Sequence, residues 1–318
     1  MLTIGVDLGG TKIAAGLCDE KGHILRARSV PTGAGRPRAQ ILADMAALCR
    51  ALAAEHGVAW QDIAAVGVAS PGFINAGQGM VLLAGNLHWT DAPVVAELTP
   101  LLDKPVFLEN DANIAALGEV AAGSMAGCSH GILLTLGTGV GGGVIIDGQI
   151  FSGAHGCGGE LGHIIIAWRG EQCACGNQGC LEAYASASAL IREGRRAAQA
   201  NPGGGILSAA GTLDAITAKT VIDCAKAGDA DAVRIFDDFI DALAMGVVSL
   251  VNVFEPEAVA IGGGVSAAGD FLLDALRARL DERLVTPQGY RPRVVLATLG
   301  NDAGIVGAAM LARNKITE

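Results

Sequence analysis

Four side chains that bind soft metal ions gather in one short stretch of this 318-residue chain: His163, Cys173, Cys175 and Cys180. Three thiolates and one imidazole complete a tetrahedral zinc set, and four protein ligands are typical of structural zinc. The spacings C-x-C and C-x4-C require a tight turn, for which Gly176 and Gly179 permit the unusual backbone angles. Ordinary reduced cysteines beside a hydrogen-bonded histidine are the alternative. A zinc hydrolase is excluded, because four protein ligands leave no open coordination position.

A glycine turn near the N-terminus follows an apolar run and reads DLGGTK, from Asp7 to Lys12. The backbone N–H groups of Gly9 and Gly10 can approach an anion without interference from a Cβ atom. Thr11 adds a hydroxyl group, Lys12 adds a positive charge, and Asp7 is placed to hold Mg²⁺ through water. We therefore predict a phosphate-binding turn, with a plain hairpin turn as the alternative.

Two further glycine turns occur later in the chain. The stretch GTGVGGG at 137–143 contains a formal G-x-G-x-x-G, but a strand is expected after it instead of the helix that a dinucleotide fold requires, so NAD is rejected. A P-loop is excluded as well, because G-K-[ST] does not occur. We interpret this turn as a phosphate cradle with Thr138 as hydroxyl donor beside Gly139. The third turn, Gly262, Gly263 and Gly264, suits the adenosine and phosphate side of a nucleotide, and a packing role is the alternative for each turn.

Polar residues crowd the sequence LENDAN at 108–113, between an expected strand and an expected helix. Binding residues are often found at such element ends. Asp111 is the candidate to accept a proton from an attacking sugar hydroxyl, and in phosphoryl transfer such a base mainly positions the nucleophile. Asn110 could hold neighbouring hydroxyls. The alternative is that Asp111 is a helix N-cap and Asn113 is solvated.

Five more residues are candidates for contact with a polyhydroxylated substrate. Gly72 and Asn86 follow apolar stretches, and each is either a turn residue or a site residue. Glu160 and Glu182 flank the cysteines, and a carboxylate suits a pair of sugar hydroxyls because it offers two acceptor oxygens. His163 could bind zinc through one ring nitrogen and orient a hydroxyl through the other.

The composition narrows the range of partners and compartments. A net charge of −10 and a pI of about 5.1 argue against nucleic acid, whose phosphates are neutralised by Lys and Arg, and weakly against an anionic membrane. The longest apolar run, 242–254, is too short to cross a bilayer. Eight cysteines, three of them in the metal-binding stretch, and no leader-like N-terminus predict a cytoplasmic protein with one metal site and no disulfide framework.

Alternating strands and helices with small apolar residues predict an α/β fold. The expected strands are 3–7, 13–18, 24–30, 64–69, 106–108, 131–136, 144–146 and 258–261, and the expected helices are 38–56, 113–122, 181–200, 229–253, 270–284 and about 302–312. Residues 201–212 are expected to be a loop. The strand–turn–strand at 131–146 repeats the one at the N-terminus, which indicates a duplicated domain.

The motifs DLGGTK, LENDAN, LGTGVGGG, GELGH, CACGNQGC, LEAYAS and IGGGVS occur in this order along the chain. Together they resemble the ROK family (repressors, open reading frames, kinases), most closely its bacterial glucokinases. The resemblance implies an actin-like (ribonuclease H-like) fold with two lobes and an active-site cleft. The lobes would be 1–112 with 301–318, and 113–300 with the zinc site.

The resemblance also implies an activity, namely ATP-dependent phosphorylation of a hexose with ATP, Mg²⁺ and structural Zn²⁺. It gives Asp111 the role of catalytic base and implies sugar contacts by Gly72, Asn86, Asn110, Glu160, His163 and Glu182. It further implies a homodimer or homotetramer. Two positions depart from the family pattern: Ala174 replaces a glycine between two zinc ligands, and Cys157 stands where alanine is usual. We interpret Cys157 as a small core residue, with a fifth thiol near the metal as the alternative.

Several activities of the same family remain to be distinguished. Phosphorylation of glucose at the 6-hydroxyl is the main hypothesis, and a kinase for N-acetylglucosamine, N-acetylmannosamine or fructose is the alternative. A sugar-responsive transcriptional regulator is a remote alternative, because such proteins carry a helix-turn-helix extension before the first strand. Here the first strand is expected at Thr3 and the net charge is acidic.

Overall fold

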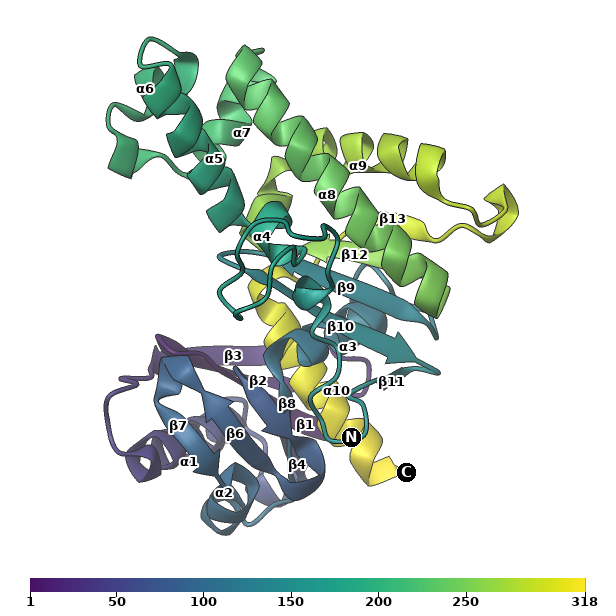
Figure 1. Ribbon diagram of the computed structural model, residues 1–318. Coiled ribbons are helices and arrows are strands. Elements are labelled where there is room, and N and C mark those ends of the chain that lie inside the picture. The colour runs from purple at the N-terminus through teal and green to yellow at the C-terminus, as the bar shows by residue number, and fades with distance from the viewer. Residues whose placement is uncertain (318) are drawn as a thin grey trace. The chain divides into compact units, whose positions relative to one another are not determined.

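The computed structural model describes residues 1–317 and divides into two compact units (Figure 1). Unit 1 comprises Met1–Leu133, Gly143–Gly159 and Thr298–Glu318, and unit 2 comprises Leu134–Gly142 and Glu160–Ala297. These limits follow from packing within each unit, and they assign the helix after Asp111 to unit 1. The lobes predicted from the sequence, 1–112 with 301–318 and 113–300, stay a prediction.

A five-stranded sheet forms the centre of unit 1, with the strand order β3-β2-β1-β4-β8. The first three strands are antiparallel neighbours, whereas β4 lies parallel to β1 and β8 lies parallel to β4. Nearly continuous apolar residues in β1, β2 and β4 suit strands that are covered on both faces. The bounds are β1 (Leu2–Leu8), β2 (Lys12–Cys18), β3 (Ile24–Pro31), β4 (Ile63–Ser70) and β8 (Val106–Asn110).

Two pairs of helices cover the two faces of this sheet. The main apolar core lies between one face and the pair α1 (Arg38–Glu55) and α2 (Val94–Leu102). On the other face α10 (Ala303–Thr317) packs on β1 and β4 and lies beside α3 (Asp111–Ala122). Glycine at two strand positions allows this close approach, because a Cβ atom on Gly5 or Gly67 would lie 1.9 or 1.8 Å from a backbone oxygen of α10.

A small antiparallel sheet, β5-β6-β7, was not predicted from the sequence. Its strands are short, and short strands give a weak periodic signal. Their bounds are β5 (Phe73–Asn75), β6 (Met80–Ala84) and β7 (Trp89–Ala92). Two predicted site residues lie at the ends of these strands, Gly72 directly before β5 and Asn86 in the 3-10 helix η3 (Gly85–Leu87) after β6. The small sheet therefore lies next to two predicted site residues in unit 1.

A second five-stranded sheet has the order β11-β10-β9-β12-β13. Counted along the chain within this sheet, the third strand, β11, lies at one edge, and the fourth and fifth, β12 and β13, complete the other side. This order matches β3-β2-β1-β4-β8 strand for strand and confirms the predicted duplication. β10 begins at Val140, inside the glycine-rich stretch, which is earlier than the predicted residue 144 because the glycines continue the strand. The bounds are β9 (Gly131–Leu136), β10 (Val140–Ile146), β11 (Gln149–Ile150), β12 (Ala258–Gly262) and β13 (Arg293–Leu296).

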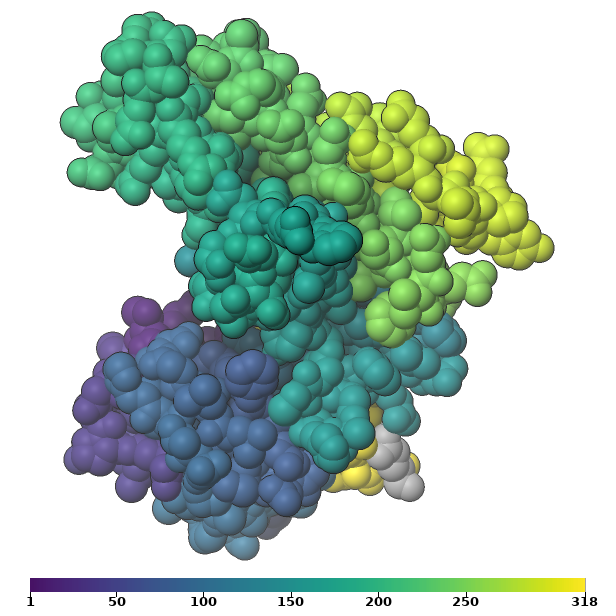
Figure 2. Space-filling view, in the orientation of Figure 1, coloured from purple at the N-terminus to yellow at the C-terminus, as the bar shows by residue number. Residues whose placement is uncertain are grey.

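The remaining helices belong to unit 2, where α5 to α9 form the region coloured green to yellow-green at the surface in Figure 2. The bounds are α4 (Glu182–Ala185), α5 (Ala187–Ala200), α6 (Gly205–Ala210), α7 (Ala218–Lys226), α8 (Ala230–Phe254) and α9 (Asp270–Arg283). Two predictions were wrong here. The helix 181–200 is interrupted at Ser186, whose extended backbone and side chain cap α5, and the expected loop 201–212 contains α6.

Two further observations complete the comparison with the sequence. The last helix continues to Thr317, past the predicted end near residue 312. Cys157 is exposed, so its interpretation as a core residue was wrong. None of the helices within residues 1–317 has the length and apolar character needed to span a membrane.

Candidate functional site

The four predicted zinc ligands form one cluster in unit 2. The ligand atoms of His163, Cys173, Cys175 and Cys180 all lie within 4.8 Å of one another. Cys173 Sγ lies 3.7 Å from His163 Nδ1, and Cys175 Sγ lies 3.7 Å from Cys180 Sγ. A tetrahedral ion with Zn–S bonds of about 2.3 Å needs sulfur atoms about 3.7 Å apart, so the ligand set and its spacing fit zinc.

The backbone of the cluster explains how such short spacings become a metal site. Gly179 has φ +81°, and a Cβ atom there would lie 1.7 Å from the Ala167 oxygen, so only glycine allows the two arms of the cluster to meet. Burial raises the pKa of the Cys173 thiol and raises that of Cys180 to about 12. A divalent cation bound here would favour the thiolate forms of these sulfurs.

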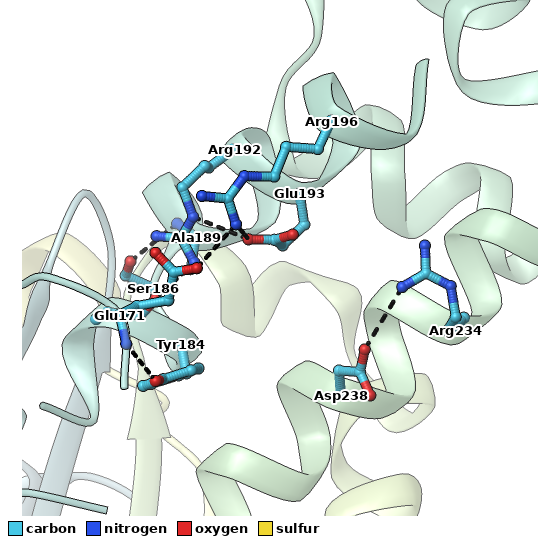
Figure 3. Close-up of polar contacts among 10 residues, drawn as sticks. Glu171, Tyr184, Ser186, Ala189, Arg192, Glu193, Arg196, Arg234 and Asp238 are labelled. Carbon is cyan, nitrogen blue, oxygen red and sulfur yellow. Dashed lines mark hydrogen bonds and ion pairs between the residues drawn. The ribbon is translucent and has the colours of Figure 1, made fainter. Parts of the chain in front are cut away.

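A layer of polar contacts supports the cluster from α4 and α5 (Figure 3). The Tyr184 hydroxyl accepts a hydrogen bond of 2.6 Å from the backbone N–H of Glu171. The Glu171 carboxylate pairs with Arg196 at 2.9 Å, and Arg192 donates to the Ala183 carbonyl at 2.8 Å. The helices that follow the last cysteine are thereby fixed to the loop that carries Cys173 and Cys175.

The predicted base lies in unit 1 at the junction of β8 and α3. Asn110 is the N-cap of α3, and its side-chain oxygen accepts hydrogen bonds from the N–H groups of Ala112 and Asn113. Asp111 is exposed, and its Oδ1 also accepts from the Ala112 N–H, at 2.9 Å. The alternative interpretation was wrong in both parts, since the cap is Asn110 and Asn113 is buried.

The junction is tied to the small sheet through Gly72. The Asn110 Nδ2 donates a hydrogen bond of 3.0 Å to the Gly72 carbonyl. Gly72 has φ +96°, and a Cβ atom there would lie 2.1 Å from the Leu83 oxygen of β6, so glycine is required. The structure thus brings together Gly72, Asn110 and Asp111, three residues predicted separately.

Glu109 is a residue of this junction that sequence reasoning missed. Its side chain is 4% exposed, and it accepts hydrogen bonds from the Asn110 N–H at 2.8 Å and from the Asn113 side chain at 3.2 Å. Burial raises the pKa of Glu109. It also lines a cavity of about 540 Å³ in unit 1. An acidic residue at the end of an apolar strand, next to two polar residues, was the signal that could have identified it.

The first glycine turn lies at the end of β1 and is held by the segment after β3. The Gly9 N–H donates to the Lys12 carbonyl at 2.9 Å, which closes the turn. Buried Thr32 donates its hydroxyl to the Gly9 carbonyl at 2.6 Å and its N–H to the Thr11 carbonyl at 2.9 Å. A Cβ atom on Gly10 would lie 3.2 Å from Asn86 Cβ, so Asn86 is a neighbour of this turn.

Asp7 lies just before this turn, against the N-terminal end of α10. A Cβ atom on Gly304 would lie 2.8 Å from the Asp7 carboxyl carbon, so the carboxylate occupies space that a side chain on the helix would fill. Burial raises the pKa of Asp7, and the nearby Lys12 opposes that shift. A half-buried carboxylate beside a turn of backbone N–H groups and a lysine is suited to a hydrated cation and a phosphate.

The second and third glycine turns meet in unit 2. Gly263 has φ +81°, and a Cβ atom there would lie 2.5 Å from the oxygen of Leu136, the residue before Gly137. The Gly137 N–H donates to the Gly139 carbonyl at 2.9 Å. The Val140 N–H donates to Glu182 Oε2 at 3.0 Å, so the glutamate predicted to contact sugar also contacts this turn.

Glu160 and Thr138 are two further predicted residues of unit 2. Glu160 is exposed and directly precedes the 3-10 helix η4 (Leu161–His163), and its carbonyl accepts from the His163 N–H at 3.0 Å. Thr138 is exposed, and its carbonyl accepts a hydrogen bond from Ser188. Ser188, like Glu109, was not predicted; it is the second residue after the LEAYAS motif.

Comparison with known proteins identifies the family. The family model described as "ROK family" matches residues 3–315. The chain belongs to the ROK family. A glucokinase of Streptomyces coelicolor is 40% identical over 317 residues, which cover 98% of this chain and 98% of that protein.

Solved structures of ROK proteins agree with the fold. The structure of a ROK family glucokinase from Streptomyces griseus, in complex with glucose and AMPPNP, matches with a TM-score of 0.79 and 38% identity, covering 99% of this chain and 100% of that one. A ROK hexokinase from Thermus thermophilus matches with a TM-score of 0.86 and 34% identity, covering 100% and 99%. The predicted actin-like α/β fold is confirmed.

Proposed function

We propose that this ROK protein is an ATP-dependent glucokinase that phosphorylates the 6-hydroxyl of glucose. Relatives named glucokinase match over nearly the whole chain, and a structural relative was solved with glucose and an ATP analogue. The observation that carries the proposal is the β8–α3 junction, where a capped helix presents the exposed carboxylate of Asp111 next to Asn110. Such a junction offers a fixed acceptor for a hydroxyl proton.

Asp111 would act as the general base. Its hydrogen bond from the Ala112 N–H restrains the carboxylate, and the N-cap bonds of Asn110 restrain the helix that carries it. As the sugar oxygen attacks the γ-phosphate, the carboxylate would accept the hydroxyl proton, and its main contribution would be to position the nucleophile.

The substrate-binding roles are proposals for each unit. In unit 1, Gly72, Asn86 and Asn110 would position sugar hydroxyls together with Asp111. In unit 2, Glu160 and His163 would do so, with Glu182 as the remaining predicted sugar residue. Support comes from the hydrogen bond between Asn110 and Gly72 and from the position of Glu160 and His163 at the two ends of η4.

ATP would be bound as its magnesium complex. In unit 1, Asp7 and the turn from Gly9 and Gly10 to Thr11 and Lys12 would hold phosphate and the hydrated ion. In unit 2, Thr138, Gly139 and the turn Gly262, Gly263 and Gly264 would hold the nucleotide. The bound Mg²⁺ supplies charge neutralisation of the phosphates.

The zinc ligands His163, Cys173, Cys175 and Cys180 would hold a structural Zn²⁺, because all four positions are filled by protein. We further infer a cytoplasmic homodimer or homotetramer that binds neither nucleic acid nor membrane, supported by the net charge of −10. Size-exclusion chromatography with light scattering would contradict the assembly by giving a monomer.

A coupled ADP-release assay tests the activity. We expect turnover with glucose and ATP above that with mannose, fructose, N-acetylglucosamine or N-acetylmannosamine. A higher kcat/KM for an N-acetylated sugar than for glucose would show that the N-acetylated sugar is the preferred substrate. No ADP release with any of these sugars would refute the proposed kinase activity.

Substitution of the base tests the mechanism. Asp111→Asn should lower kcat by about 10²- to 10⁴-fold, the usual contribution of general base catalysis, while glucose binding measured by calorimetry is largely kept. Asp270→Asn is the matched control, because Asp270 is also the exposed first residue of a helix, α9. Near-normal kcat in Asp111→Asn would contradict the assignment.

A further inference from the structure

We propose that the cavity of about 540 Å³ along β8 is a binding site for a small organic amine, with the ammonium group on Glu109 and the apolar body against the cavity walls. Every residue that lines this cavity belongs to unit 1. Its size lies within the range of pockets that hold small molecules, about 300–1,000 Å³. The inference goes beyond the proposed kinase activity and does not depend on it.

The cavity has a buried interior and an exposed rim. The interior is lined from β8, α3 and α10 by side chains that are at most 9% exposed: Val106, Leu108, Glu109, Leu117 and Leu311. The rim is formed by exposed residues of the 3-10 helix η2 (Ala76–Gln78), of β11 and of the end of α10: Gly77, Gln78, Gln149 and Lys315. An apolar ligand body is stabilised in such an interior because it leaves water there. Glu109 is the charged group among these interior residues.

One oxygen of Glu109 lacks a hydrogen-bond donor. Its Oε1 accepts from the Asn110 N–H at 2.8 Å and from Asn113 Nδ2 at 3.2 Å, whereas Oε2 has no hydrogen-bond partner within residues 1–317. The neighbouring Asn113 Oδ1 is buried and is also without a partner in the described part of the chain. Two acceptor atoms without donors favour a ligand that supplies N–H groups, because a ligand that only accepts would leave both of them unpaired.

The charge of Glu109 favours an ammonium group over a neutral donor. Burial raises the pKa of Glu109, because the carboxylate loses hydration. An ammonium group brings three N–H donors and a positive charge, which together offset part of the cost of burying the carboxylate. Lys315 also lines the cavity, but it is exposed, so water and salt screen its charge at the rim. The buried carboxylate therefore determines the sign of the charge that the interior accepts.

The strand β8 offers further polar groups because it is the edge strand of its sheet. The Pro105 carbonyl accepts a hydrogen bond of 2.9 Å from the Val66 N–H of β4, so the backbone groups of Val106 and Leu108 are expected to face the free edge. Val106 and Leu108 both line the cavity. A ligand with its ammonium group on Glu109 can therefore also pair with backbone along the strand, which would fix its orientation.

Tryptamine is the probe, because it joins an ammonium group to an apolar indole ring. Indole-3-ethanol lacks the positive charge and indole-3-propionate reverses it, so the three compounds share one apolar body. Backbone amide shifts in NMR titrations without glucose or ATP report both the affinity and the place of binding. We expect tryptamine to bind with a Kd of about 1 mM or below and to shift residues 106–109 and 148–152. The other two compounds should bind at least about tenfold more weakly, as expected for loss of one charged hydrogen bond.

Three variants test the assignment to Glu109. Glu109→Gln should weaken tryptamine binding at least about tenfold, because the ammonium group loses its ionised acceptor. The control Glu20→Gln removes an exposed carboxylate from a neighbouring pocket that shares part of its lining with the cavity, and it should leave the affinity unchanged. Ile150→Trp fills part of the cavity from β11, leaves Glu109 in place and should also weaken binding. Should Glu109→Gln fail to fold, Ile150→Trp and the three compounds supply the test.

The proposal would be overturned by the absence of amide shifts at 106–109 and 148–152 with about 10 mM tryptamine, well above the expected Kd. Equal affinity for tryptamine and indole-3-propionate would overturn it as well, because the carboxylate would then not select the charge. Unchanged affinity in folded Glu109→Gln would do the same. Phosphorylation of glucose plays no part in these readouts, so failure of the proposed kinase activity would leave the result intact.

Discussion

The two glycine turns at 9–12 and 137–140 occupy equivalent places in two sheets of the same strand order, yet they are supported in different ways. The turn in unit 1 is held by Thr32, a fully buried residue next to the same sheet, and Asp7 before it packs against α10. The turn in unit 2 is held by Glu182 and Ser188, which follow the predicted zinc ligands along the chain.

The difference shows that a duplicated strand arrangement does not duplicate its supports. In unit 1 the support comes from a hydrophobic core and a helix that closes on the sheet, which depend on apolar burial. In unit 2 it comes from hydrogen bonds next to the predicted zinc site, whose geometry would depend on metal binding. The two turns should therefore respond to different perturbations.

The largest effect is expected from Gly67→Ala in β4. The new Cβ atom would lie 1.8 Å from the Ala308 oxygen, so α10 must shift away from the sheet, at a cost of about 1–3 kcal/mol or more. Thermal unfolding should show the loss, and amide exchange at 9–12 should accelerate while that at 137–143 does not. Gly35→Ala, at an exposed position with no atom within 4 Å, is the control. Equal acceleration at both turns would show that their supports are shared.

A matched pair of hydroxyl deletions should give intermediate effects of unequal size. Thr32 is buried, so Thr32→Val leaves the Gly9 carbonyl without its hydrogen-bond donor and should lower the free energy of unfolding by about 1–3 kcal/mol. Ser188 is exposed, so in Ser188→Ala water can replace the hydrogen bond to the Thr138 carbonyl, and the loss should be under about 1 kcal/mol. Denaturant unfolding gives the two values. A larger cost for Ser188→Ala would reverse the comparison and place the stronger support in unit 2.

The smallest effect concerns Glu109, the carboxylate that caps a strand end in unit 1 as Glu182 does in unit 2. Burial raises the pKa of Glu109 above its ordinary value of 4.5, so the folded protein binds the proton more tightly than the unfolded one. Tighter proton binding by Glu109 in the folded protein therefore contributes to the free energy of unfolding at low pH. That contribution falls as the pH rises from 4.5 through the raised pKa.

Glu109→Gln should remove that pH dependence and change stability at neutral pH by less than about 1 kcal/mol, because lost charged hydrogen bonds and relieved desolvation oppose each other. Chemical denaturation between pH 4.5 and 8 measures it. Parallel curves for the variant and the original chain would show that Glu109 does not titrate differently on folding.

Much of the site could be predicted because its residues lie in short motifs. The zinc ligands lie within one stretch, and the residues Asn110 and Asp111 are adjacent in sequence, so local spacing is enough to group them. Glu109 and Ser188 were missed because their roles depend on the backbone groups that folding places beside them. The break at Ser186 was missed because the apolar pattern continues through it. The helix α6 was missed because its apolar pattern is too short to judge.

The amino-acid sequence by itself determined most strands of the two five-stranded sheets, the duplicated strand–turn–strand unit, a candidate ligand set for zinc and the ROK family, because these are carried by periodicity and local motifs. Only the tertiary structure decided which residues support each turn. It placed Glu182 on the Val140 N–H, Thr32 on Gly9 and Gly304 against Asp7. Such pairings depend on where separate segments meet after packing, and sequence separation gives no direct information about that distance.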